Sequence, residues 1–190
     1  MSPQESDASR LQEILGEFYA GRVDRNRARS AVIDVVLNRI GCRRVSMWKF
    51  EGSNSDLRLL CFASKTAGGA LDITEHRLAQ AEYRDYFNAL VERGVYVSND
   101  AMSAPALQAM RESYLVANGV RSLLDAAFML NGRAYGMVCC EETLATRDWR
   151  AGDVIALRAI VTRLALLMSG APESAPWSTP SLPLQTIGGY

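Results

Sequence analysis

The 190-residue chain carries 21 basic and 21 acidic side chains, so its formal net charge is zero. This balance gives no reason to expect nucleic acid or an anionic membrane as a partner. Hydrophobic residues make up 48% of the chain, enough for one buried core of ordinary size. The N-terminus lacks the pattern of a secretory signal, and no apolar run approaches the roughly 20 residues of a membrane span. We therefore expect a cytoplasmic protein.

The first forty residues have the apolar spacing of two helices. Residues 1–9 are polar and are expected to fray, whereas apolar side chains recur at three- and four-residue steps over 10–20. A second apolar stripe covers 28–40 and stops at Gly41, a residue that suits the end of a helix.

The next part of the chain mixes strands and helices. Alternating or continuous apolar runs indicate strands, and apolar side chains at helical spacing indicate helices. The expected order is a strand at 44–50, an antiparallel strand at 57–63, an irregular glycine-rich stretch at 65–75, a helix at 79–92, a short strand at 95–97 and a helix at 105–116.

A hairpin is predicted at the centre of the sheet. Its arms, Ser122–Leu130 and Tyr135–Glu142, are joined by Asn131 and Gly132, and Asn-Gly favours the type I′ turn of a two-residue hairpin. Arms that are apolar on both faces are typical of strands covered on both sides. Asp125 interrupts the first arm, so its carboxylate must be paired or must face a cavity.

The last predicted helix, 153–168, has a heptad-like apolar seam. From Ser169 onward the sequence is rich in Pro, Ser and Ala, which indicates a linker or a disordered tail.

Together these elements predict an α/β fold of the α+β type in three layers. A central antiparallel sheet of five to six strands would carry the terminal helices on one face and the mid-chain helices on the other. The strand 44–50 would pair with one side of the hairpin and the strand 95–97 with the other.

The segments resemble, in order and spacing, a GAF domain, the small sensory domain of bacterial signalling proteins and cyclic-nucleotide phosphodiesterases. The resemblance divides the chain into an N-terminal helical extension (1–26), a GAF-like domain (27–169) and a disordered tail or linker (170–190). It rests on Arg44–Phe50, Tyr83–Leu90, Val95–Asp100, Tyr114–Asp125, Tyr135–Glu141 and the tripeptide Arg147-Asp148-Trp149.

The resemblance implies a non-enzymatic sensory or regulatory domain without cofactor or metal. It would bind a small molecule of unknown identity between the sheet and the mid-chain helices, form a homodimer through its terminal helices, or do both. An effector domain or a partner signalling protein would carry the output. The expected dimer interface consists of Leu11, Ile14, Phe18, Val154, Leu157, Val161, Leu164 and Met168.

The expected ligand site combines acids with aromatic side chains, which suits an organic cation or a hydrogen-bond donor such as a ring N–H group. Three alternatives stay open. Asp125 could pair with an internal arginine (Arg44, Arg121 or Arg133), the aromatic residues could be core, and Glu141 could be a solvated strand end. The site residues are Ser46, Trp48, Phe50, Tyr83, Tyr86, Phe87, Tyr114, Asp125 and Glu141.

Other chemistries of similar domains find little support in these residues. Bilin attachment commonly places a cysteine beside a histidine and haem needs an axial histidine, but His76 is the only histidine and has no cysteine near it in sequence. The cysteines, including Cys61, Cys139 and Cys140, are expected to be reduced and to act as small apolar residues. The alternative function is a thiol-based redox enzyme or sensor similar to free methionine-(R)-sulfoxide reductase, which needs an accessible cysteine of low pKa.

Overall fold

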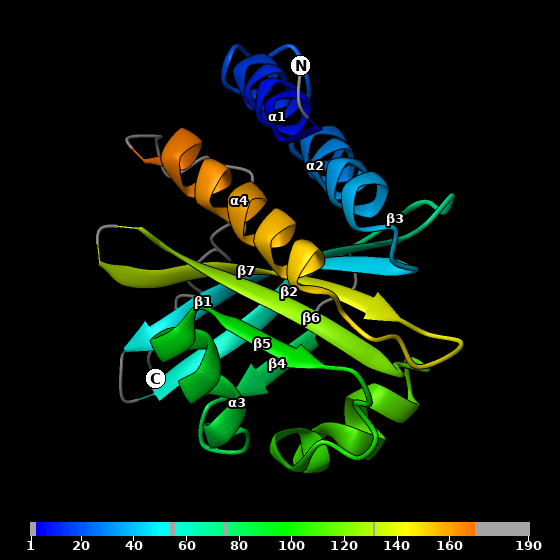
Figure 1. Ribbon diagram of the computed structural model, residues 1–190. Coiled ribbons are helices and arrows are strands. Elements are labelled where there is room, and N and C mark those ends of the chain that lie inside the picture. The colour runs from blue at the N-terminus through cyan, green and yellow to red at the C-terminus, as the bar shows by residue number, and fades with distance from the viewer. Residues whose placement is uncertain (1–2, 54–55, 74–75, 131, 170–190) are drawn as a thin grey trace, which may run out of the picture.

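The computed structural model describes residues 3–53, 56–73, 76–130 and 132–169. Within them lies a seven-stranded antiparallel sheet of order β3-β2-β1-β7-β6-β5, in which β4 also pairs with β2 (Figure 1). The expectation of five to six strands missed the short strands β3 and β4. The strands are β1 (Arg44–Ser53), β2 (Asp56–Thr66), β3 (Leu71–Asp72), β4 (His76–Ala79), β5 (Val95–Ser98), β6 (Ser122–Leu130) and β7 (Arg133–Glu142).

The central hairpin has the predicted position. β6 spans the predicted residues, β7 begins earlier, at Arg133, and β1 and β5 flank the pair as expected. Gly132 has a φ of 74°, as a type I′ turn requires, whereas Asn131 lies outside the described residues. Leu124 packs in one hydrophobic core and its neighbour Leu123 in another, so both faces of the strand are covered.

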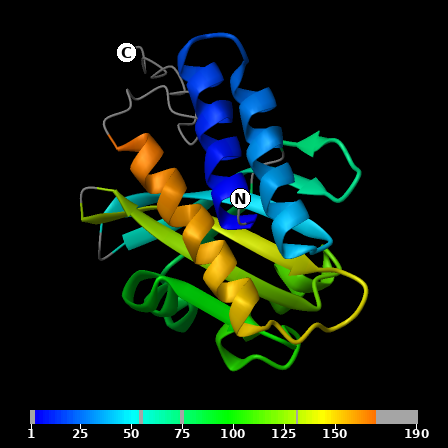
Figure 2. The ribbon, with the colours of Figure 1, turned by 45° about the horizontal axis from the view of Figure 1, so that its top comes forward.

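Helices cover both faces of the sheet, as predicted. One face carries α1, α2 and α4, and the opposite face carries α3, η1, η2 and η3, which we call the mid-chain helices (Figures 1 and 2). None of the helices in the described part of the chain has the length and apolarity needed to cross a membrane. Their bounds are α1 (Pro3–Tyr19), α2 (Arg25–Ile40), α3 (Arg84–Asn88), the π-helix η1 (Ala89–Arg93), the 3-10 helix η2 (Pro105–Met110), the π-helix η3 (Arg111–Val116) and α4 (Ala151–Met168).

Two predicted boundaries and one predicted helix type were wrong for reasons of packing. Residues 3–9 do not fray: they form the first turns of α1, where Asp7 lies 3.3 Å from the guanidinium of Arg39 on α2. The expected helix 79–92 starts only at Arg84, because the preceding residues pair with β2 as β4. The helix expected at 105–116 is a 3-10 segment followed by a π-helix. Segments this short have little helical stability of their own, so their winding follows the packing of their apolar side chains.

The expected dimer seam packs mostly inside one chain. Six of its eight residues are buried in the core between the terminal helices and the sheet, and Phe18 and Val154 pack against that core. Side chains already buried in one chain offer almost no surface to a second copy. The six are Leu11, Ile14, Leu157, Val161, Leu164 and Met168.

Candidate functional site beneath the mid-chain helices

A row of polar side chains crosses the sheet face beneath the mid-chain helices. Strand register places Asp125 opposite Cys139, Cys139 opposite Ser46, and Glu141 opposite Arg44. Because alternate side chains of a strand share a face, this register brings the polar residues together. All nine predicted site residues are buried, and the six aromatic ones belong to the hydrophobic cluster on this face.

Asp125 is fully buried and only half satisfied. Its Oδ2 accepts a hydrogen bond of 2.6 Å from the Tyr86 hydroxyl on α3, whereas Oδ1 has no hydrogen-bond partner in the described part of the chain. The Cys139 thiol also lies close enough to donate to this carboxyl group, but S–H is a weak donor and does not replace an N–H or O–H partner. Asp125 does not form the ion pair with an internal arginine that was the expected alternative, within the residues that the structure describes. Leaving a buried acceptor unsatisfied costs free energy.

Burial also changes the proton affinity of this group. The pKa of Asp125 is raised to about 7: desolvation is the main cause, hydrogen bonds from the Cys139 thiol and the Tyr86 hydroxyl lower the pKa, and the Glu141 charge raises it. Asp125 therefore exchanges its proton near neutral pH. Burial and the neighbouring Asp125 raise the pKa of Tyr86 well above its usual value, so the tyrosine stays a neutral donor.

Glu141, by contrast, is fully buried and fully paired. The Tyr114 hydroxyl donates a 2.7 Å hydrogen bond to Oε1, and the Arg44 guanidinium forms an ion pair with Oε2. Arg44 also donates to Asn118 Oδ1 over 3.0 Å. The alternative of a solvated strand end was wrong, because the end of β7 lies under η3 and beside β1. Both carboxylate oxygens are occupied.

The aromatic residues pack edge to face against one another. Ring centroids lie 5.8 Å apart for Trp48 and Tyr114, and 6.1 Å apart for Tyr86 and Phe87. Trp48 Nε1 donates to Ser46 Oγ over 2.8 Å, so these two polar groups satisfy each other. These aromatic residues are thus part of the hydrophobic core on this face, the alternative left open for them in the sequence.

Sequence reasoning missed Tyr96. Its ring lies 5.1 Å from that of Tyr86, and strand register places it opposite Asp125. The predicted strand at 95–97 contains Tyr96, but the pairing of β5 with β6 was needed to bring it to the acid.

The cysteines are unsuited to thiol chemistry. All four are free and buried, and burial raises the pKa of Cys61 to about 12 and those of Cys139 and Cys140 well above the usual range. The reactive form of cysteine is the thiolate, so these side chains are poor nucleophiles. This disfavours the thiol-based alternative. No cluster of three His, Cys, Asp or Glu side chains that could hold a metal ion occurs in the described residues.

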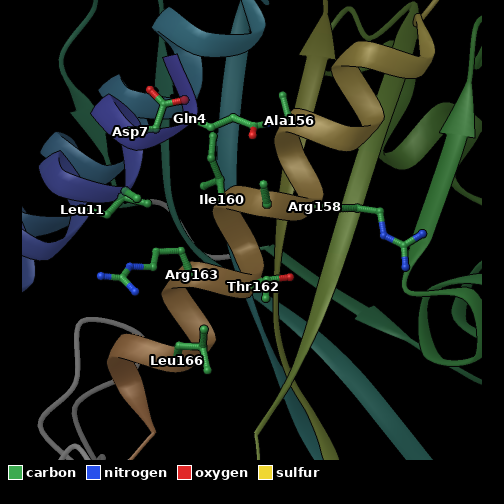
Figure 3. Close-up of a pocket in the computed structure, with 11 residues that line it drawn as sticks. Gln4, Asp7, Leu11, Ala156, Arg158, Ile160, Thr162, Arg163 and Leu166 are labelled. Carbon is green, nitrogen blue, oxygen red and sulfur yellow. The ribbon is translucent and has the colours of Figure 1, made fainter. Parts of the chain in front are cut away.

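A second candidate site lies on the opposite face of the sheet, between α1 and α4. Figure 3 shows this groove, which has a volume of about 400 Å³. Its walls combine small and apolar side chains with arginines and one acid. Lining residues are Gln4, Asp7, Ala8, Leu11, Ala156, Arg158, Ala159, Ile160, Thr162, Arg163 and Leu166.

Comparisons with known proteins agree with this architecture. The model of the GAF domain family matches residues 24–168. Solved structures show the same fold at low identity. The phycoerythrobilin-bound GAF domain of a cyanobacterial phytochrome has a TM-score of 0.68 at 17% identity, over 87% of this chain and 94% of that one. The phycocyanobilin-bound GAF domain from a cyanobacterial phytochrome has a TM-score of 0.66 at 16% identity, over 88% of this chain and 94% of that one. The PixJ GAF domain of Thermosynechococcus elongatus reaches 0.61 at 15%, over 85% and 87%. No curated protein matches the sequence.

Proposed function

Since the chain belongs to the GAF domain family, we propose that it is a non-enzymatic sensory or regulatory domain that binds a small molecule between the sheet and the mid-chain helices. The observation that carries the proposal is Oδ1 of Asp125, which is fully buried on the sheet face and has no hydrogen-bond partner among the described residues. A ligand that donates a hydrogen bond to this atom removes the cost of leaving it unsatisfied.

The ligand class follows from the difference between the two acids. Glu141 already holds a cation and a hydroxyl, so it has little to offer a ligand. Asp125 has no cationic partner in the described ranges, and the rings of Tyr86 and Tyr96 lie beside it. An organic cation with an N–H group and a flat apolar body satisfies the free oxygen, holds the carboxyl group ionised and packs on the aromatic rings.

The named structural neighbours support an organic ligand in this fold, since two of them are described with bound bilins. The cysteines of this chain disfavour covalent attachment of a bilin. All four are buried, and the pKa values of Cys61, Cys139 and Cys140 are raised.

Thermal unfolding in the presence of a panel of organic amines, amidines and their uncharged isosteres tests the proposal. A ligand at 100 times its Kd adds about 2.7 kcal/mol of stability, which corresponds to a Tm increase of roughly 5–10 °C for a chain of this size. We expect cationic members to raise Tm in the native protein and not in Asp125→Asn. The control Asp85→Asn removes an exposed carboxylate on the same helix as Tyr86 and should keep the response. A response that survives Asp125→Asn would contradict the proposed anchor.

We also propose that the domain forms a homodimer through the exposed face of α4. Ile155 and Leu166 are 59% and 62% exposed, and with Ala159 and Thr162 they form a strip spaced by four, three and four residues. That spacing lets two copies of one helix pack side by side about a two-fold axis. The strip runs beside the groove of Figure 3, which Ala159, Thr162 and Leu166 help to line.

Sedimentation tests the dimer. The double variant Ile155→Lys, Leu166→Lys should convert a dimer to a monomer. At concentrations low enough to dissociate the native dimer it should keep the native Tm, because neither side chain is part of the core. Leu144→Lys, a change at another exposed leucine, serves as the control. A native protein that sediments as a monomer at high concentration would refute this proposal.

A further inference from the structure

The last two residues of β7 are both acids and point to opposite faces of the sheet. Glu141 lies beneath the mid-chain helices, bonded to Tyr114 of η3 and paired with Arg44. Glu142 faces the terminal helices and accepts a 3.1 Å hydrogen bond from Nη1 of Arg147. One dipeptide therefore connects the proposed ligand face with the helices on the other side.

Arg147 joins the ends of two terminal helices. Its Nη2 donates to the carbonyl of Ile40 over 2.8 Å and its Nη1 to the carbonyl of Gly41 over 3.0 Å, at the C-terminus of α2. Nη2 also lies 3.3 Å from the carboxylate of Asp153, in the first turn of α4. A cation at a helix C-terminus and an anion at a helix N-terminus are both favourable, so one guanidinium group holds both helix ends.

The backbone around Arg147 is held as well. The Arg147 amide donates to Ser122 Oγ over 2.7 Å, and the amide of Trp149 donates to Asn99 Oδ1 over 3.1 Å. The Trp149 ring lies 4.4 Å from the guanidinium carbon. The guanidinium group thus has a defined position between Glu142, the C-terminus of α2 and the first turn of α4.

We propose that the dipeptide Glu141-Glu142 and the positioning residue Arg147 transmit changes beneath the mid-chain helices to α2 and α4. This inference rests on the proposed function, because the signal would be a ligand that binds beneath the mid-chain helices and moves η3. When Tyr114 leaves Glu141, the end of β7 relaxes, the bond from Glu142 to Arg147 loosens, and the junction of α2 with α4 changes.

Asp125 provides an internal contrast. Its sequence neighbours on the other face of β6, Leu124 and Ala126, are buried in the apolar core between the sheet and the terminal helices. That face offers no charged side chain at either position. Loosening the bond between Tyr86 and Asp125 should therefore free α3 locally and leave the ends of α2 and α4 unchanged.

Hydrogen exchange of the ligand-free protein tests the transmission and does not depend on any ligand. We compare Tyr114→Phe in the native chain with Tyr114→Phe in a Glu142→Gln chain, and use Tyr86→Phe as the matched control. Loss of one hydroxyl bond to a buried carboxylate should speed exchange of 111–116 by about fivefold or more. In the native chain we expect an acceleration of about threefold at residues 36–41 and 151–157.

The Glu142→Gln chain decides the question. There, Tyr114→Phe should still loosen 111–116 but should no longer change 36–41 and 151–157. Three outcomes overturn the proposal: an effect of Tyr114→Phe confined to the mid-chain helices, an effect on the terminal helices that persists in Glu142→Gln, or an equal effect from Tyr86→Phe. Because these measurements use the ligand-free protein, they test transmission separately from ligand binding. The exchange experiment can refute transmission while ligands still raise Tm, and it can support transmission while no ligand raises Tm.

Discussion

Asp125 and Glu141 make a matched pair with different partners. Both carboxyl groups are fully buried on the same face of the sheet, and each accepts a hydrogen bond from a tyrosine of a mid-chain helix. Among the residues that the structure describes, only Glu141 of the two has a cation, because β1 places Arg44 beside it. The same residue chemistry therefore yields a closed structural junction at Glu141 and an open acceptor at Asp125. Burial alone does not make an acid a ligand site: the partners around it decide.

The largest effect should come from removing the cation. Arg44→Ala leaves Glu141 buried without its counter-ion, and breaking one partner of a buried pair costs about 3–5 kcal/mol. Urea denaturation should show this loss of unfolding free energy. The adjacent and exposed Arg43→Ala should cost less than about 0.5 kcal/mol. Equal effects at the two positions would show that the ion pair of Glu141 contributes nothing beyond ordinary packing.

The second effect is a pH dependence that belongs to Asp125. Its pKa is about 7 in the folded protein, against 3.8 for the ordinary group, so the folded state binds the proton more tightly. The stabilisation is complete below pH 3.8 and is lost as the pH rises through 7. Between pH 5 and pH 8 the native protein should lose about 2–3 kcal/mol relative to Asp125→Asn.

Denaturation of both proteins across this pH range measures that difference. Asp85→Asn should keep the native slope, because its carboxylate is exposed. Parallel stability curves for the native protein and Asp125→Asn would mean that the carboxyl group titrates at its ordinary pKa and is better solvated than its burial implies.

The smallest effect separates the two tyrosines. Tyr86→Phe removes the hydroxyl hydrogen bond to Asp125 and should cost about 1–2 kcal/mol at pH 8 and less at pH 5.5, where the acid is protonated. Tyr114→Phe leaves Arg44 on Glu141, so it should cost about 1 kcal/mol at both pH values. Thermal unfolding of both variants at the two pH values measures these losses of stability. Losses that depend on pH in the same way for both variants would contradict the proposed difference between Asp125 and Glu141.

Sequence patterns predicted the strands and helices well wherever a pattern is typical of only one kind of structure. Runs that are apolar on both faces and joined by Asn-Gly are typical of the covered strands of a hairpin, and β6 matches its predicted bounds, Ser122–Leu130. The terminal helix stripe is different, because the same apolar spacing serves a core or a dimer. Leu157 and Leu164 proved to be core, and the exposed strip of α4 begins at Ile155.

The sequence by itself determined the layers, the central hairpin, the family and the presence of a buried acid at Asp125. Only the tertiary structure decided which acid is paired. Arg44 and Glu141 are 97 residues apart, and their ion pair exists because β1 and β7 are neighbours in register. The surroundings of Asp125 Oδ1, and the placement of Glu141 and Glu142 on opposite faces at the end of β7, also depend on how the strands pair. Hydrogen bonds and ion pairs act over a few ångströms, and residues distant in sequence come that close only after the sheet has formed.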